Sequence, residues 1–519
     1  MMNDDSPPRS RLSLPLPPSI IHHSAFIILV AEVLLVAALT GWLATGRPLG
    51  IKGVWAYEVK PKALRPEALV RVLVVGGAIT GLCALGLARI RSRRRSDAPV
   101  VAGLVALTFV LQLAVAGLAP SSASMLVAGT VSPVSTEYFE VARSVQDPAA
   151  FCRDYAGTML QGHHHVATHP PGAVLFYWVC QRLYDSRVFP GEAFSRLTEL
   201  AVGATREVMA RAANSFPAVQ ATPDAVGPAL FSCLALGLLG ALSVIPLYHL
   251  ARTVGSRRSA ITVASLWALA PAPVLFFQGL DAVIMLLVVL ALAWVAAAFR
   301  SGRWWWAVGA GVALGVALFV SFGTLAAIAE VGLLAGVLAL RSPRERRPLA
   351  WRVLGALGAA GLVVVLTADA ACGMRLPTIF RQAMQAHRQF TWIGQHRTYG
   401  TWVGLNLVEF GCFLGLPIVV AVLGAVGRGL AGGWRRAPLA VIVGATGLAV
   451  LLALDVSGSV RGEVGRVWLF LMPALVVGAG CWLATNAPRK RLLACATAAL
   501  LLVQLVVLGQ ALTPLVLPF

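Results

Sequence analysis

Apolar runs of about 20 residues recur along the whole chain and constrain its fold more than any other feature. A helix of that length crosses the hydrocarbon core of a bilayer. The chain is 58% hydrophobic and only 12% charged, which leaves too few polar side chains for the surface of a soluble domain. The sequence therefore predicts an all-α polytopic membrane protein with about 13 transmembrane helices. They are expected near 26–45, 69–89, 98–119, 226–249, 259–277, 282–299, 304–320, 323–340, 353–370, 403–425, 437–454, 467–484 and 491–510.

Clusters of arginine between the apolar runs predict which side of the membrane each loop faces. Short arginine-rich loops prefer the cytoplasm, so the net charge of +20 indicates topology, and no nucleic acid is expected as a partner. With the N-terminus inside, every cluster falls inside, provided that the segment 171–184 does not cross the membrane. The clusters lie at 89–95, 252–258, 300–303, 341–347, 428–436 and 489–491.

The stretch 166-VATHPPGAVLFYWV-179 is too short to be a span. A helix over 171–184 would cover roughly 20 Å, against a hydrocarbon core of about 30 Å. We expect it to lie along the outer interface, with Phe176, Tyr177 and Trp178 at headgroup depth. A second amphipathic helix is predicted at 191–214. Its apolar face would comprise Phe194, Leu197, Leu200, Ala204 and Val208.

The chain divides by topology into four parts. These are a cytoplasmic tail (1–25), two N-terminal spans (26–97), a core (98–340) with a large outer loop at 120–225, and a C-terminal part (341–519) with outer loops at 371–402 and 455–466. A further outer loop lies at 46–68. The cytoplasmic loops are short, so any chemistry is expected outside. Eight scattered cysteines show no CxxC spacing and leave disulfides open.

Four motifs follow one another in the core: 135-STEYFEVARSV-145, 168-THPPGAVLFYW-178, 252-RTVGSRRSA-260 and 276-FFQGLDAVIM-285. In this order and sidedness the chain resembles the GT-C membrane glycosyltransferases, in particular the protein O-mannosyltransferase and lipid A aminoarabinose transferase group. The resemblance covers about 98–340, and the rest by topology. It implies a multi-pass fold with a catalytic first outer loop. It also implies transfer of a sugar from a polyprenyl-phosphate carrier to an outer-face acceptor, with inversion.

Two positions depart from the pattern that the resemblance implies. The usual catalytic aspartate falls near Ser135, so the acid must come from Glu137 or another neighbour. The outer turn 321-SFGT-324 lacks the basic residue common in that place.

Two acids at the outer ends of predicted spans are the candidate catalytic residues. Glu137, beside Tyr138, is the candidate base that accepts the acceptor's proton. Glu140 would share its face one helical turn later, although solvated acids on an interfacial helix are the alternative for both. Asp281 follows a tight outer turn, where the resemblance implies a site role. Its simpler role is a charge that favours the dipole of the next helix.

Histidines gather on the predicted outer loops, at His163, His164, His165, His169, His387 and His396. Consecutive histidines cannot all point at one ion, and no acid lies at ligand spacing. No metal ligand is therefore predicted, although a divalent cation stays possible as a cofactor. His169, ahead of two prolines, is expected to contact the carrier phosphate or the sugar, or else simply to start a helix.

The positive-inside rule disfavours arginines on outer loops, so their presence there indicates an anionic partner or ligand. A lipid-linked phosphate is one reason, while anionic phospholipid or an ion-paired loop is the alternative. The candidate substrate-binding residues, with Tyr138, Glu140 and His169, are His387, Arg388, His396, Arg397, Arg461, Glu463 and Arg466. Glu330 lies within a span, where a carboxyl group is costly, and has no assigned role.

The predicted function is a glycosyltransferase of the cell membrane with its site on the extracytoplasmic face. Its partners would be a polyprenyl-phosphate sugar donor, a glycan, lipid or protein acceptor, and membrane lipids. Two alternatives stay open. One is a carrier or flippase for a lipid-linked substrate, against which the sequence shows no internal repeat and no paired broken helices. The other is a non-catalytic relative that serves envelope assembly, because of Ser135.

Overall fold

The structure is a computed structural model of the chain. It describes residues 18–51, 54–57, 65–90, 96–118, 122–132, 137–161, 165–186, 192–211, 221–394, 397–486 and 490–511. These residues are mostly helical, as predicted. The exception is an antiparallel hairpin of strands β1 (Leu49–Ile51) and β2 (Trp55–Tyr57) in the outer loop 46–68.

Most of the predicted spans are present as long apolar helices. Nine stretches of the described residues are long and apolar enough to cross a membrane. They are formed by α1 (Pro18–Ala44), α2 (Pro66–Arg89), α3 (Ala98–Ala116), α10 (Pro223–Leu242) with α11 (Val244–Val254), α14 (Asp281–Ser301), α16 (Thr324–Arg341), η2 (Arg344–Arg346) with α17 (Arg347–Cys372), α21 (Leu439–Ser457) and α24 (Lys490–Ala511).

Four predicted spans differ from that pattern. Two are short helices, namely α15 (Trp305–Val320) and η4 (Leu469–Leu471) continued by α23 (Met472–Asn486). The span near 403–425 is instead the pair α19 (Tyr399–Leu414) and α20 (Leu416–Leu430), bent by 106°. The span near 259–277 is α12 (Arg257–Leu269) and α13 (Pro271–Leu275). The chain is a multi-pass α-helical membrane protein, and the number of thirteen crossings stays a prediction.

Both broken spans have identifiable causes. Gly415 has φ +107°, which L side chains rarely adopt. Pro271 begins α13 without a backbone N–H. The two breaks are neighbours, because a Cβ at Gly415 would lie 3.5 Å from Pro271 Cδ. Freed backbone groups in a membrane need partners, and glutamines supply them. Gln504 accepts from the Leu416 N–H at 2.9 Å and donates to the Cys412 carbonyl at 2.7 Å.

Replacing Gln504 by leucine is expected to leave the Leu416 N–H and the Cys412 C=O buried without this partner. Each loss costs about 1–3 kcal/mol, so we expect a lower melting temperature for the purified chain. The control is Gln385→Leu, since Gln385 is exposed on a surface helix. Equal melting temperatures for the two variants would show that Gln504 does not hold the break.

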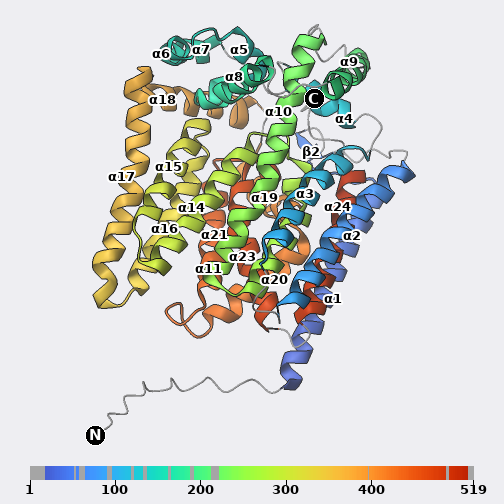
Figure 1. Cartoon of the computed structure of the whole chain (residues 1–519), viewed down its shortest axis with the longest axis vertical. Helices are drawn as coiled ribbons and strands as arrows, with labels where there is room; N and C mark the ends of the chain where they lie inside the picture. Colours follow the sequence, from blue (N-terminus) through green and yellow to red (C-terminus); the bar gives the residue numbers. More distant parts are fainter. Residues whose placement is uncertain are drawn as a thin grey trace.

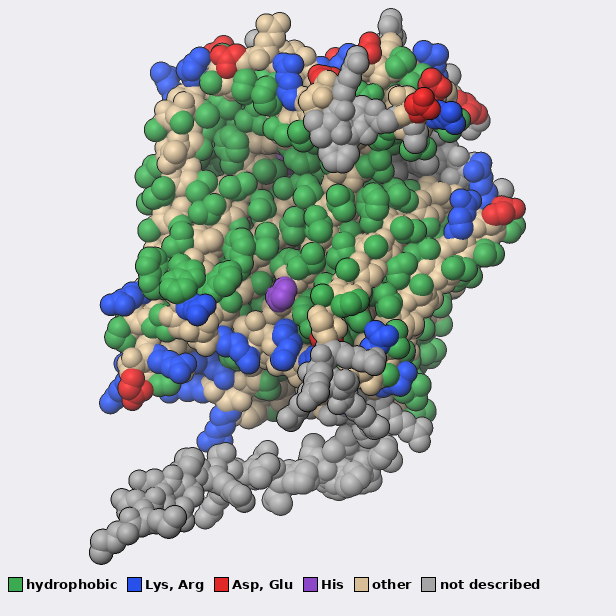
Figure 2. All heavy atoms as spheres, viewed as in Figure 1, with side chains coloured by type: hydrophobic (Ala, Val, Ile, Leu, Met, Phe, Trp, Pro, Cys, Tyr) green, Lys and Arg blue, Asp and Glu red, His purple; other side chains and the backbone are tan. Residues whose placement is uncertain are grey.

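The two ends of the molecule carry different charges. Basic side chains line the lower rim in Figure 2, an apolar band follows, and the upper rim is mixed in charge. We call the lower rim the basic end, and contacts join several of the loops that carry the described arginine clusters. Arg257 pairs with Asp97 at 2.6 Å, and Arg341 donates to the carbonyls of Arg435 and Ala437 at 3.0 and 2.7 Å.

The opposite end, which we call the loop end, carries short helices of the outer loops (Figure 1). They are α4 (Ser122–Val131), α5 (Tyr138–Ser144), α6 (Pro148–Arg153), α7 (Tyr155–Gln161), η1 (Val166–Thr168), α8 (Gly172–Asp185), α9 (Glu192–Arg211), α18 (Leu376–His387), the π-helix η3 (Arg388–Gly394) and α22 (Val464–Val467). A second apolar core joins α5, α7 and α8 to the ends of the spanning helices. At Gly172, a Cβ would lie 2.2 Å from the Phe319 carbonyl oxygen, so α8 begins pressed against the end of α15.

Both predicted amphipathic helices are present at the loop end. In α8, Tyr177 is buried against Phe139, whereas Phe176 and Trp178 are half-buried. In α9, Leu197 and Leu200 are exposed, while the opposite face packs on α4 and α10. The helical period predicted the apolar face of α9 correctly. The exposure of these leucines fits the expected helix along the membrane interface, whose apolar face meets lipid.

Glu330 lies fully buried in α16, where one carboxylate oxygen would be 3.0 Å from a Cβ at Gly447. Among the described residues, neither oxygen has a hydrogen-bond partner. Burying such a group is costly. We therefore expect Glu330→Leu to raise the melting temperature of the purified chain. Glu330→Gln, which keeps polar atoms there, should gain less, and a lower melting temperature for Glu330→Leu would contradict this account.

Candidate active site

Glu137 occupies a strained position at the start of α5. It has φ 59° and ψ −33°, outside the helix that follows. A non-glycine residue at positive φ costs free energy and is concentrated at functional sites. Its side chain is buried, and the carboxylate accepts a hydrogen bond from the Val166 N–H at 3.1 Å. The fold therefore holds this acid in place despite the cost in backbone conformation.

The HPP motif packs directly against the residue after Glu137. The Tyr138 ring lies edge-on to His165 and His169, with centroids 5.8 and 5.6 Å apart. His169 Nδ1 lies 3.0 Å from Thr168 Oγ1 and 3.1 Å from the His165 carbonyl oxygen. Tyr155 donates to the His169 carbonyl at 2.9 Å. These contacts fix the orientation of His169 beside Tyr138.

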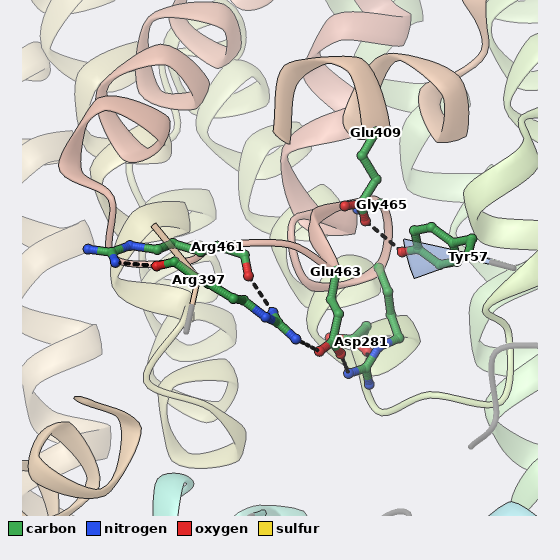
Figure 3. A network of polar contacts seen from close by, with 8 residues as sticks. Tyr57, Asp281, Arg397, Glu409, Arg461, Glu463 and Gly465 are labelled. Carbon is green, nitrogen blue, oxygen red and sulfur yellow. Dashed lines mark hydrogen bonds and ion pairs between the residues drawn. The ribbon is translucent and has the colours of Figure 1, made fainter. Parts of the chain in front are cut away.

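A partly buried ion-pair network forms the second part of the site (Figure 3). Arg466 donates to Asp281 at 3.4 Å and to Glu463 at 3.1 Å. Arg397 donates to the other Glu463 oxygen at 3.2 Å. Arg397 and Arg461 each donate to the other's backbone carbonyl, the latter at 2.6 Å. Four side chains that were predicted separately for substrate binding thus form one network with Asp281.

Charges within this network set the protonation of its members. Burial acts to raise the pKa of Glu463, but Arg466 and Arg397 outweigh it and hold that pKa below its ordinary value. Burial acts against the charge of Arg466, yet Asp281 and Glu463 raise its pKa. The arginine is therefore charged and Glu463 ionised. Glu463 and Asp281 serve as partners of Arg466, which leaves Glu137 as the better candidate for a base.

Tyr138 connects the two parts electrostatically. Burial raises its pKa well above the ordinary value, and the neighbouring Tyr155 adds to the effect. Arg466 lowers this pKa and Asp281 raises it, so both charges act on the ring that also contacts His169. Tyr138, which follows Glu137 in the chain and contacts His169, is therefore also near Asp281 and Arg466.

A third contact in Figure 3 was missed by sequence reasoning. Tyr57, from β2, donates to Glu409 at 2.6 Å, and Glu409 also accepts from the Gly465 N–H at 2.9 Å. Burial raises the pKa of Tyr57, and Glu409 raises it further. The pair anchors the turn that carries Arg466. An acid inside the apolar segment 403–425 was the signal that could have drawn attention to Glu409.

Tyr57→Phe is expected to remove one of the two contacts that hold Glu409. The buried carboxylate then loses a hydrogen bond, at a cost of about 1–3 kcal/mol, and the melting temperature of the chain should fall. Tyr399→Phe is the control, because the Tyr399 hydroxyl donates to the Val456 carbonyl from an exposed side chain. If both variants melt at the same temperature, the Tyr57–Glu409 contact does not anchor the turn.

The remaining predicted residues are placed less centrally. His387 contacts the Ser459 carbonyl at 2.8 Å through Nε2, which joins α18 to the loop 455–466. Arg388 is exposed on η3. Glu140 does not share a face with Glu137, since Glu137 precedes the helix. It is half exposed and pairs with Arg143 at 3.7 Å. Ser135, His163, His164 and His396 lie outside the described residues.

Within the described ranges, no cluster of side chains could hold a metal ion. No three His, Cys, Asp or Glu side chains there come together at a metal-binding spacing. Charge in the described part of the site is carried instead by guanidinium and carboxylate groups.

No protein-family model matches the chain, and no curated protein matches it. Among solved structures, the chain is similar to the Saccharomyces cerevisiae protein O-mannosyltransferase Pmt1–Pmt2 complex bound to the sugar donor, with TM-score 0.28 and 17% identity over 58% of this chain and 34% of that one. It is also similar to the Archaeoglobus fulgidus oligosaccharyltransferase tethered to an acceptor peptide, with TM-score 0.39 and 13% identity over 77% of this chain and 55% of that one. The apo form of that enzyme gives TM-score 0.38, 13% identity, and coverage of 74% and 56%. The chain thus spans between about a third and just over half of these proteins, and scores this low say nothing about individual site residues.

Proposed function

We propose that the chain is a membrane glycosyltransferase that transfers a sugar from a polyprenyl-phosphate donor to an acceptor at the extracytoplasmic face of the cell membrane. One observation carries the proposal. A strained, buried acid and a partly buried arginine network, from segments far apart in the sequence, lie on either side of Tyr138 at the end of the molecule opposite the arginine-rich loops.

Glu137 acts as the general base. Its carboxylate takes the proton of the acceptor hydroxyl as that oxygen attacks the anomeric carbon, a role worth about 10²–10⁴-fold in rate. The bond to the Val166 N–H orients the carboxylate. His169 and Tyr138 line the same corner and contact the sugar or the carrier phosphate.

The arginine network stabilises the leaving group. Negative charge grows on the carrier phosphate as the glycosidic bond breaks, and fixed guanidinium groups favour that charge. Arg466 is held in place by Asp281 and Glu463, and Arg397 by Glu463 and the turn at Arg461. Base and phosphate lie on opposite sides of the anomeric carbon, so a single displacement inverts its configuration.

The sidedness follows from the arginine clusters. The basic end is cytoplasmic by the positive-inside rule, and the loop end then faces out. A lipid-linked donor can reach this end from the outer leaflet, while the acceptor approaches from water.

The test is sugar transfer by the reconstituted chain, with radiolabelled polyprenyl-phosphate sugars as donors. Glu137→Gln should abolish product formation, while Ser135→Ala should spare it. Transfer that survives Glu137→Gln would remove the proposed base.

A carrier for a lipid-linked substrate is the second candidate, and one observation favours it. The breaks at Gly415 and Pro271 are neighbours, and paired broken helices are typical of substrate sites in transporters. Movement of the lipid-linked sugar across vesicles without a glycosidic product would support this candidate instead.

A further inference from the structure

Two cysteines from distant parts of the chain lie side by side at the loop end. Cys152 is on α6, in the first outer loop, and Cys372 is the last residue of α17. The two helices pack on each other, and the Cys372 side chain lies near enough to Cys152 to act on the pKa of its thiol. The next residues also touch, since a Cβ at Gly373 would lie 3.2 Å from Arg153 Cγ. Both cysteines belong to the apolar core beneath the loop helices.

We propose that Cys152 and Cys372 form a disulfide that ties the first outer loop to the outer end of α17. The inference rests on the sidedness in the proposed function, because disulfides persist in extracytoplasmic compartments and not in the cytoplasm. The link would secure the segment that carries His169, since α6 packs on α17, and α18 packs on α7 and η1.

The bond forms by exchange with a disulfide donor, either a small molecule or an oxidoreductase. Burial, and then the neighbouring Cys372, raise the pKa of Cys152 to about 12, so the half-buried Cys372 attacks the donor first. Cys372 gains one donor sulfur and releases the other as a thiol. Cys152 then attacks the Cys372 sulfur and releases the second donor thiol. Two protein thiols are oxidised, the donor disulfide is reduced, and the two protons end on the donor thiols.

A second thiol pair provides an internal comparison. Cys83 and Cys495 also lie near each other, on the packed helices α2 and α24. Both lie toward the basic end of their helices, since α2 ends and α24 begins there. In a reducing cytoplasm this pair is expected to stay as thiols. The two pairs are therefore similar in proximity. They are expected to differ in redox state because they lie on opposite sides of the membrane.

The test uses the full chain in its native membranes, treated with N-ethylmaleimide before solubilisation and digested with trypsin without reduction. Arginines at 143, 153, 352 and 375 bracket the two cysteines. The disulfide then gives peptide 144–153 joined to peptide 353–375, a mass that disappears on reduction. C152S and C372S should each lack it, while C180S should retain it. The Cys83 and Cys495 peptides should carry the maleimide.

Recovery of both peptides with maleimide on Cys152 and Cys372 would overturn the inference. A second experiment then distinguishes a wrong sidedness from thiols that are too far apart. In that experiment the purified, reduced chain is treated with oxidised glutathione. A linked peptide only here means that the thiols meet but the loop end faces a reducing compartment, which contradicts the proposed sidedness as well. No link in either experiment means that the thiols do not meet. The sugar-transfer assay, which does not depend on these thiols, then judges the proposed function separately.

Discussion

Glu137→Gln is expected to lower the rate of sugar transfer about 10²–10⁴-fold, with little change in stability. The amide oxygen of glutamine can still accept the Val166 N–H at the position of the carboxylate oxygen, 3.1 Å away. The amide has no basicity with which to take the acceptor's proton. Initial rates with a fixed donor concentration, together with the melting temperature, separate the lost chemistry from a lost fold.

Two further variants sharpen this prediction. Glu140→Gln is the matched control, because Glu140 is three positions away but half exposed and paired with Arg143. It should transfer sugar at the wild-type rate. Glu137→Gly relieves the positive φ at this position but leaves the buried Val166 N–H without this partner, so it should be inactive and no more stable than Glu137→Gln. Equal losses for Glu137→Gln and Glu140→Gln would contradict the assignment of the base.

Arg466→Ala is expected to be the most damaging single change in the molecule. It leaves Asp281 and Glu463 without their shared guanidinium partner. Leaving a partly buried carboxylate without its hydrogen-bond partner costs about 1–3 kcal/mol. Removing a fixed charge from the leaving phosphate costs about 10²–10³-fold in rate. Both losses should appear together, as a lower melting temperature and as near-complete loss of transfer.

Two further variants separate the loss of stability from the loss of transfer rate. Arg466→Lys keeps the charge but not the planar fork that bonds both acids, so it should regain stability in part and activity less. Arg196→Ala is the control, since its side chain is 80% exposed and its partner Glu192 lies 4.0 Å away. Wild-type transfer by Arg466→Ala at a temperature where it is folded would exclude the network from the reaction.

Hydropathy and arginine placement predicted much of the fold, because both reflect interactions of a segment with the membrane and not with a particular partner. The long spans such as α14 and the surface position of α8 are of this kind. The breaks at Gly415 and Pro271 are not, since the apolar run continues through them. They depend on Gln504 and Gln112, which lie on distant helices and bond the Leu416 N–H and the Pro273 carbonyl.

The sequence motifs predicted which residues could belong to the site. They could not predict which of these residues contact one another. Glu137, His169, Asp281 and Arg466 were singled out separately, each by its residue type and its place at an outer end. Their grouping required the fold, because it depends on pairings across much of the chain. The Tyr57–Glu409 contact shows the limit, since it joins residues 352 positions apart.

Sidedness of the loop end is the central claim, and accessibility labelling tests it most directly. Single cysteines are introduced by Glu140→Cys at the loop end and Arg435→Cys at the basic end, both exposed positions, in a chain whose own cysteines are replaced by serine. In intact cells, a membrane-impermeant maleimide should label the Glu140→Cys chain, and the Arg435→Cys chain only after permeabilisation. Labelling of the Arg435→Cys chain from outside, with the Glu140→Cys chain protected, would turn the site toward the cytoplasm and contradict the account.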